Sequence, residues 1–174
     1  LQDSSAASDV YKRQIETLNH RAMRKELEVS AVSIHAYPEI SENYALMNCG
    51  ASMGEGYGPM IVAKQGVSEE EAKSSPIAVP GLKTSAYLGI RLCWGDLQYE
   101  VVPFDEIIPR ILDDTYKSGL IIHEGQLTYV DHDLNVLANL GIWWNEKTGG
   151  LPMPLGGNVV RRDLGQKMME FHEC

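Results

Sequence analysis

Residues 119–129 have the sequence GLIIHEGQLTY, which decides the fold class. The apolar run at residues 120–122 follows a glycine, a pattern typical of a short buried strand. It leads directly into His123 and Glu124. Ligands collect at the carboxyl ends of strands in open α/β sheets, so the pattern predicts a ligand site here. A single His after a strand is more often structural than catalytic. The polar residues beside His123, and an imidazole that titrates near neutral pH, favour a general base.

Hydrophobic patterns on both sides of this run predict alternating helices and strands. The predicted helices are 15–27, 84–93, 106–114 and 141–148, and the other predicted strands are 29–35, 45–49, 59–64, 77–79, 99–104, 136–140 and 158–162. Such alternation indicates an α/β architecture, and we expect mostly parallel strands. Residues 151–157, LPMPLGG, are too rich in Pro and Gly for either kind of element.

The pattern divides into two blocks, which predicts two lobes with a cleft between them. The predicted units are part of lobe 1 at 15–64, lobe 2 at 65–155, and a return crossover with the start of a lobe 1 C-terminal helix at 156–174. Residues 50–59, GASMGEGYGP, contain four glycines but lack the Gly-Lys-Ser/Thr ending of a phosphate loop. We therefore expect a hinge or a ligand-facing loop there.

Residues 1–14, LQDSSAASDVYKRQ, differ from the rest of the chain. They are small and polar and show no helical or strand period, which predicts a disordered or non-native tail. At the other end, a helical pattern stops at Cys174 without a cap or stop signal. We expect a chain that is shortened at both ends.

Composition excludes several classes of protein. The formal net charge of -9 argues against nucleic-acid binding, and no apolar run has the length of a membrane span. The three cysteines are far apart and form no Cys-x-x-Cys pair, which favours reduced thiols in the cytoplasm. No His, Cys, Asp or Glu set has the spacing of metal ligands. The expected partner is a small molecule, and the oligomeric state stays open, a homodimer included.

Hydroxyl residues supply the other candidate site. Thr84 and Ser85 open a predicted helix just after a strand, so their N–H groups and hydroxyls can bind a carboxylate or phosphate. The alternative is that Thr84 is only an N-cap. Ser33 ends a first-lobe strand, where a packed Ser is the alternative. Glu124 either orients His123 or is simply solvated.

Several segments together resemble 1,4-dihydroxy-6-naphthoate synthase, an enzyme family of the futalosine route to menaquinone. They are IETLN (15–19), SIHAYPEI (33–40), GASMGEGYGPMIVA (50–63), VPGLKTSAYL (79–88), VVPFDEI (101–107), GLIIHEGQLTY (119–129), LGIWWNEKTGGLPMPLGGN (140–158) and RRDLG (161–165). The resemblance covers nearly all of residues 15–165 in the right order.

The resemblance implies a type II periplasmic-binding-protein-like α/β fold of two lobes with hinge crossovers. It also implies a cofactor-free lyase that converts cyclic dehypoxanthinyl futalosine to 1,4-dihydroxy-6-naphthoate. His123 matches the proposed base of the family. Ser33 matches a Ser that faces the cleft, and Ser85 stands where the family carries a second Thr beside Thr84. Gly156 and Gly157 match the return crossover.

Two departures from the family concern the first lobe. The family's first strand with its ligand loop, and its C-terminal helices, have no counterpart here. We therefore expect an incomplete first lobe and an inactive fragment. Chorismate dehydratase of the same pathway is the alternative enzyme, although the IIHEGQ motif and the combination of WW with LPMPLGG argue against it. A solute-binding protein is the alternative without an enzymatic activity.

Overall fold

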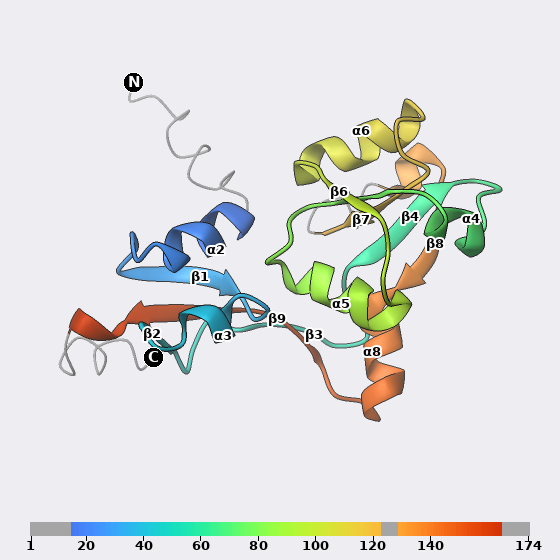
Figure 1. The fold of residues 1–174 in the computed structure, drawn as a ribbon. Coiled ribbons are helices and arrows are strands. Elements are labelled where there is room, and N and C mark those ends of the chain that lie inside the picture. Colours follow the sequence, from blue (N-terminus) through green and yellow to red (C-terminus); the bar gives the residue numbers. More distant parts are fainter. Residues whose placement is uncertain (1–14, 123–128, 165–174) are drawn as a thin grey trace, which may run out of the picture.

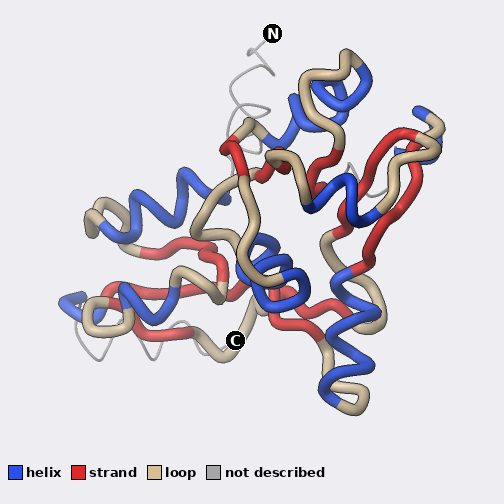
Figure 2. Tube along the Cα trace, turned by 45° about the vertical axis from the view of Figure 1, so that its right-hand side comes forward, coloured by secondary structure: helices blue, strands red, loops and turns tan. Residues whose placement is uncertain are grey.

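The computed structural model describes residues 15–122 and 129–164. The predicted tail, His123, Glu124 and the predicted C-terminal helix lie outside these described residues. Two β-sheets dominate the described part (Figure 1). The view in Figure 2 shows both sheets with helices packed around them.

The first sheet is built around one long strand. Strand β9 (Met153–Arg161) pairs antiparallel with β1 (Val29–Ser33), β2 (Tyr44–Leu46) and β3 (Ser52–Gly54). Helix α2 (Ile15–Met23) packs on β1, and α3 (Tyr37–Ile40) follows it in sequence. The short 3-10 helix at Arg162–Leu164 follows β9. A small core that includes Val32, Tyr44 and Val159 stabilises this unit.

The second sheet has five strands in the order β6-β5-β7-β4-β8. Its strands are β4 (Met60–Lys64), β5 (Ile77–Val79), β6 (Tyr99–Val101), β7 (Ser118–Ile121) and β8 (Leu134–Asn139). Its helices are α4 (Glu69–Lys73), α5 (Ser85–Trp94), α6 (Ile107–Leu112) and α8 (Leu140–Thr148), with 3-10 helices at Phe104–Glu106 and Tyr129–His132. This sheet holds most of the hydrophobic core.

Alternating side chains bury both faces of the second sheet. Ile61 of β4 and Leu120 of β7 pack on the side of α5 and α8, whereas Val62 and Ile121 pack on the side of α6. Successive residues of a strand point to opposite faces, so a sheet covered on both sides has apolar residues at consecutive positions. This explains why residues 120–122 form a continuous apolar run.

The expectation of mostly parallel strands is wrong. Among the described strands, the pairs β5–β6 and β5–β7 of the second sheet are parallel. The pairs β4–β7 and β4–β8 of that sheet are antiparallel, and so are the pairs of the first sheet. The chain reaches β4 directly from the first sheet, so β4 begins where the two sheets meet. Strand β7 ends at that same place. A strand that enters from the first sheet must therefore run against the strands that end there.

The expectation that residues 151–157 form neither helix nor strand is also wrong. Residues from Met153 onward belong to β9, and Gly156 and Gly157 pair with Ser33 and Val32. Pairing with β1 begins only at Gly156, so Pro154 lies beyond the part of β9 that faces β1. Tertiary pairing thus overrides the low strand propensity of this segment.

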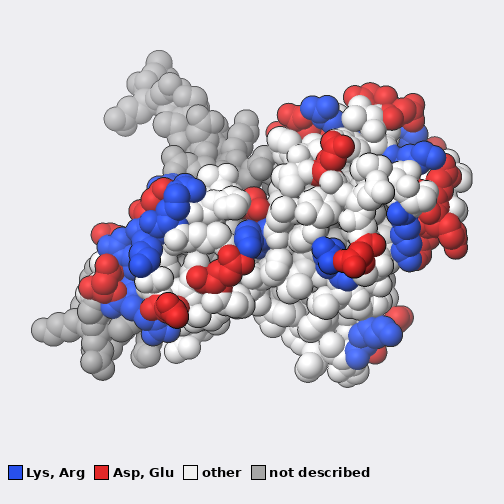
Figure 3. Space-filling view, in the orientation of Figure 1, with Lys and Arg blue, Asp and Glu red and all other residues white. Residues whose placement is uncertain are grey.

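Charges on the surface are mixed in sign. On the face shown in Figure 3, acidic and basic side chains lie close together in many places. Ion pairs such as Lys64–Asp114 and Arg110–Glu106 account for part of this mixture. Among the described residues, no helix is long and apolar enough to cross a membrane.

Candidate functional site

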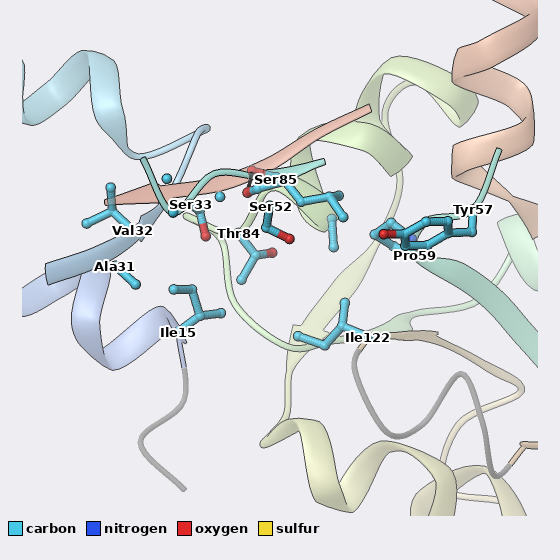
Figure 4. Close-up of a pocket in the computed structure, with 15 residues that line it drawn as sticks. Ile15, Ala31, Val32, Ser33, Ser52, Tyr57, Pro59, Thr84, Ser85 and Ile122 are labelled. Atoms are coloured by element: carbon cyan, nitrogen blue, oxygen red, sulfur yellow. Dashed lines mark hydrogen bonds between the residues drawn. The ribbon is translucent and has the colours of Figure 1, made fainter. Parts of the chain in front are cut away.

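A cavity of about 360 Å³ lies where the two sheets meet (Figure 4). All five predicted substrate-binding residues, namely Ser33, Thr84, Ser85, Gly156 and Gly157, line it. The other residues that line it are Ile15, Ala31, Val32, Gly50, Ser52, Tyr57, Pro59, Ala86, Ile122 and Leu155. In Figure 4 the side chains of Ser33, Ser52, Thr84 and Ser85 lie together on one side of the cavity, and Ile15 and Ile122 lie across from them. The cavity therefore has one polar side and one apolar side.

The N-terminus of α5 forms part of the polar side. Thr84 is the N-cap: its hydroxyl accepts a hydrogen bond from the Tyr87 N–H at 3.1 Å and donates one to the Gly81 carbonyl at 2.8 Å. The first N–H groups of a helix have no partner inside the helix. Those of Thr84 and Tyr87 are satisfied locally. Among the described residues, the N–H groups of Ser85 and Ala86 therefore remain as donors for an anion.

The Ser85 hydroxyl has partners within the protein. It donates to the Leu155 carbonyl at 2.5 Å and accepts from the His35 N–H at 3.3 Å. The His35 ring nitrogen Nδ1 lies 3.1 Å from the Thr84 carbonyl oxygen, which can only accept. These bonds join α5 to β9 and to the end of β1. The backbone N–H groups at this corner, rather than the two hydroxyls, are therefore free for a ligand.

Asn19 is a residue of this site that the sequence reasoning missed. It is fully buried, and its Nδ2 donates to the Ser33 hydroxyl oxygen at 3.0 Å. The Ser33 N–H in turn donates to Asn19 Oδ1 at 2.8 Å. A signal was present in the sequence, because Asn19 stands four residues after Ile15 and three before Ala22, on the apolar face of the helix. A polar residue at such a position needs a buried partner.

Helix α2 also contacts the turn that precedes α5. Both carboxylate oxygens of Glu16 lie 3.1 Å from the Lys83 N–H, which donates to them. Asn19 Nδ2 lies 3.3 Å from the Lys83 carbonyl oxygen. The Glu16 side chain is only 13% exposed. One turn of α2 thus binds both the N–H and the carbonyl of a residue that belongs to the other sheet's unit.

The predicted base, His123, lies outside the described residues, as does Glu124. Ile122, which directly precedes His123 in the sequence, lines the cavity. None of the described residues that line the cavity carries a charge. The role of His123 therefore stays a prediction, and the described walls supply neutral donors and apolar contacts.

Other reactive groups lie away from this cavity. Burial raises the pKa of the Cys93 thiol, and the nearby Glu69 carboxylate raises it further. This thiol therefore stays protonated near neutral pH and is a poor nucleophile. Within the described ranges, no group of three or more His, Cys, Asp or Glu side chains is placed to hold a metal ion.

Comparison with known proteins gives a family match over almost the whole chain. The model of a family described as menaquinone biosynthesis matches residues 3–173. The chain is 37% identical to a 1,4-dihydroxy-6-naphthoate synthase of Streptomyces coelicolor, over 91% of this chain and 57% of that protein. It is 36% identical to the enzyme of the same name from Thermus thermophilus, over 89% of this chain and 56% of that protein. The chain thus spans a little over half the length of these relatives.

Solved structures confirm the predicted fold class. A protein from Archaeoglobus fulgidus superposes with a TM-score of 0.84 at 45% identity, over 90% of this chain and 58% of that one. The arginine-bound protein ArgBP of T. maritima gives a TM-score of 0.57 at 16% identity, over 90% of this chain and 69% of that one. A binding-protein component of a phosphonate transporter from Pseudomonas aeruginosa gives a TM-score of 0.61 at 12% identity. The match covers 90% of this chain and 58% of that one. The chain therefore has a periplasmic-binding-protein-like fold.

Proposed function

The chain belongs to the menaquinone biosynthesis family, and we therefore propose that it comes from a 1,4-dihydroxy-6-naphthoate synthase. The observation that supports this proposal best is the cavity between the two sheets. It gathers the five residues that the family resemblance marks for substrate binding, from segments up to 124 residues apart, since Ser33 and Gly157 both line it.

The proposed reaction is a lyase reaction that needs no cofactor. A base removes a proton next to a carbonyl group of cyclic dehypoxanthinyl futalosine. The spiro ring then opens, and elimination releases the sugar-derived portion and makes the naphthalene ring aromatic. The product is 1,4-dihydroxy-6-naphthoate. Such chemistry needs a base that can accept and return a proton in a site from which water is excluded.

The walls of the cavity suit the two ends of this substrate. We assign its carboxylate to the N–H groups of Ser85 and Ala86, because a helix N-terminus attracts negative charge. We assign its ring system to the apolar side formed by Ile15 and Ile122. Tyr57 adds an aromatic wall.

We assign the base to His123. Among the described residues that line the cavity, no side chain is a carboxylate, an imidazole or an amine, the usual groups for a general base. His123 is joined directly to Ile122, a residue of the cavity wall. An imidazole at that point is matched to proton transfer near neutral pH.

The test is naphthoate formation from cyclic dehypoxanthinyl futalosine by the complete gene product, with His123→Ala beside the unmodified protein. We expect the substitution to lower kcat by about a hundredfold or more, the usual contribution of a positioned general base. His132→Ala is the matched control, because His132 is an exposed residue of a 3-10 helix and should keep full activity.

Two outcomes would change the assignment. Equal activity of the unmodified protein and His123→Ala would keep the synthase and place the base elsewhere. A folded protein that forms no naphthoate would contradict the synthase. Assays for dehydration of chorismate, and then for solute binding without turnover, would follow.

A further inference from the structure

The orientation of the buried Asn19 carboxamide is fixed by its partners. The Ser33 backbone N–H can only donate, so the atom 2.8 Å from it must be the amide oxygen. The Lys83 carbonyl can only accept, so the atom 3.3 Å from it must be the amide nitrogen. These two contacts independently require the same orientation of the amide, which excludes the flipped alternative.

This orientation determines the hydrogen of the Ser33 hydroxyl. Asn19 Nδ2 donates to the Ser33 oxygen at 3.0 Å, which occupies one of its two lone pairs. An amide nitrogen cannot accept, so the Ser33 hydroxyl cannot donate back to Asn19 Nδ2. In the described part of the chain, this hydroxyl donates to no other group. Ser33 lines the cavity and is 2% exposed, so its hydrogen remains for a group inside the cavity.

We propose that Asn19 is a positioning residue that makes the Ser33 hydroxyl a hydrogen-bond donor to a ligand oxygen. With the N–H groups of Ser85 and Ala86, Ser33 then completes a corner of the cavity that contains only donors. Such a corner selects an anionic or carbonyl oxygen and rejects a ligand donor, because two donors that face each other remain unpaired. The assignment of this oxygen to the substrate carboxylate rests on the proposed function.

The burial of Asn19 supports this role over a purely structural one. A buried amide is costly unless it is fully hydrogen-bonded, and an apolar side chain would be the simpler choice on the inner face of α2. The partners of Asn19 include both hydrogen-bonding groups of Ser33 and the carbonyl of Lys83. Asn19 therefore orients a cavity residue of one unit while it contacts the turn before α5 of the other.

A double-mutant cycle between Asn19→Asp and Ser33→Ala tests the proposal in the complete gene product. The new carboxylate of Asn19→Asp can accept from the Ser33 hydroxyl and so turns its hydrogen away from the cavity. We expect each single substitution to raise KM about tenfold, the effect of one lost hydrogen bond, and to leave kcat within about threefold. The double substitution should be no worse than either single one, because both act through the same hydrogen.

The control separates this role from a general loss of stability. Ser68→Ala removes another side chain that accepts a helix N–H, at the start of α4, and Ser68 does not line the cavity. It should lower the melting temperature and leave KM unchanged. Asn19→Ala removes the amide without adding a buried charge, and it replaces Asn19→Asp in the cycle if the latter does not fold.

The outcomes distinguish this inference from the proposed function. Additive effects on KM, or a normal KM in Asn19→Asp, would overturn the role of Asn19 while the synthase assignment stands. If the unmodified protein forms no naphthoate, the same cycle is measured as the Kd of benzoate, a simple aromatic carboxylate. If the two substitutions then lower benzoate affinity non-additively, the positioning role of Asn19 is supported even though the synthase assignment has failed. Additive losses, or no benzoate binding by the unmodified protein, would overturn the inference.

Discussion

At the scale of single residues, three hydroxyl groups that line the same cavity have different hydrogen-bond partners. Thr84 caps α5 and is 2% exposed, and both of its hydrogen bonds go to the protein backbone. Ser85 likewise binds the backbone of other elements. Of these three residues, Ser33 alone keeps its hydroxyl hydrogen for the cavity. The N-cap that the sequence offered as the alternative for Thr84 is therefore real, and a ligand role for its hydroxyl would have to compete with it.

This difference predicts the effect of Thr84→Val, which keeps the shape of the side chain and removes the hydroxyl. It leaves the Tyr87 N–H without its partner and removes one of the two donors to the Gly81 carbonyl, both in a buried place. We expect the free energy of unfolding, measured in urea, to fall by about 2 kcal/mol. Ser68→Ala is the control, because Ser68 caps α4 at an exposed position, and it should cost about 0.5 kcal/mol. If both substitutions lower the free energy of unfolding by the same amount, burial of the Thr84 cap does not add to its contribution to stability.

At the scale of elements, the beginning of α8 packs directly on the connection between β3 and β4. A Cβ atom placed on Gly141 would lie 2.1 Å from the Tyr57 carbonyl oxygen, and one placed on Gly58 would lie 2.9 Å from the Gly141 Cα. The Leu140 N–H donates to the Pro59 carbonyl at 2.9 Å. This backbone contact fixes a segment whose residues Tyr57 and Pro59 line the cavity.

We therefore expect Gly141→Ala to be strongly destabilising, although alanine favours helices. The added methyl group meets backbone atoms that cannot rotate away, which should lower the free energy of unfolding by about 3 kcal/mol. Glu146→Ala places an alanine at an exposed position of α8. It should change the free energy of unfolding by no more than about 0.5 kcal/mol. Chemical denaturation of both variants decides, and a stable Gly141→Ala protein would refute the close contact.

The presence of helices and strands was predicted from the sequence better than the directions of the strands and their pairing partners. The helix after β5 and the strand before His123 follow from local signals, because an N-cap Thr and an apolar run act within a few residues. The direction of β4 depends on which sheet the chain comes from, which no local pattern records. The strand at 153–157 escaped prediction because its pairing with Ser33 joins residues more than 120 positions apart. Asn19 has its partners at Ser33, 14 residues away on the next strand, and at Lys83, 64 residues away, and neither contact follows from the helix pattern alone.

At the scale of the whole molecule, few polar contacts connect α2 to the unit of the second sheet. Glu16 accepts from the Lys83 N–H inside this junction, whereas Glu39 pairs with the Lys83 ammonium group at the surface. The two carboxylates contact the same lysine in different surroundings, because their side chains are 13% and 50% exposed. Hydrogen bonds from buried N–H groups to charged acceptors stabilise far more than exposed ion pairs do.

This contrast predicts different effects of Glu16→Ala and Glu39→Ala. The first should lower the free energy of unfolding by about 2 kcal/mol and speed hydrogen exchange of the Lys83 amide. The second should change stability by about 0.5 kcal/mol at most and leave that amide protected. Exchange measured by NMR on both variants is the test. Unchanged protection in Glu16→Ala would show that this contact does not hold the two units together.

Strand β9 also determines the order in which the chain can fold. Among the described strands, β1, β2 and β3 each pair with β9 and with no other strand. During synthesis these three strands leave the ribosome long before Arg161 is added. The second sheet is complete once Asn139 is available, so it can fold cotranslationally while the earlier strands wait unpaired. Strands β1, β2 and β3 are thus made before the second sheet but gain their own sheet after it, and the high contact order of their pairing with β9 slows that step.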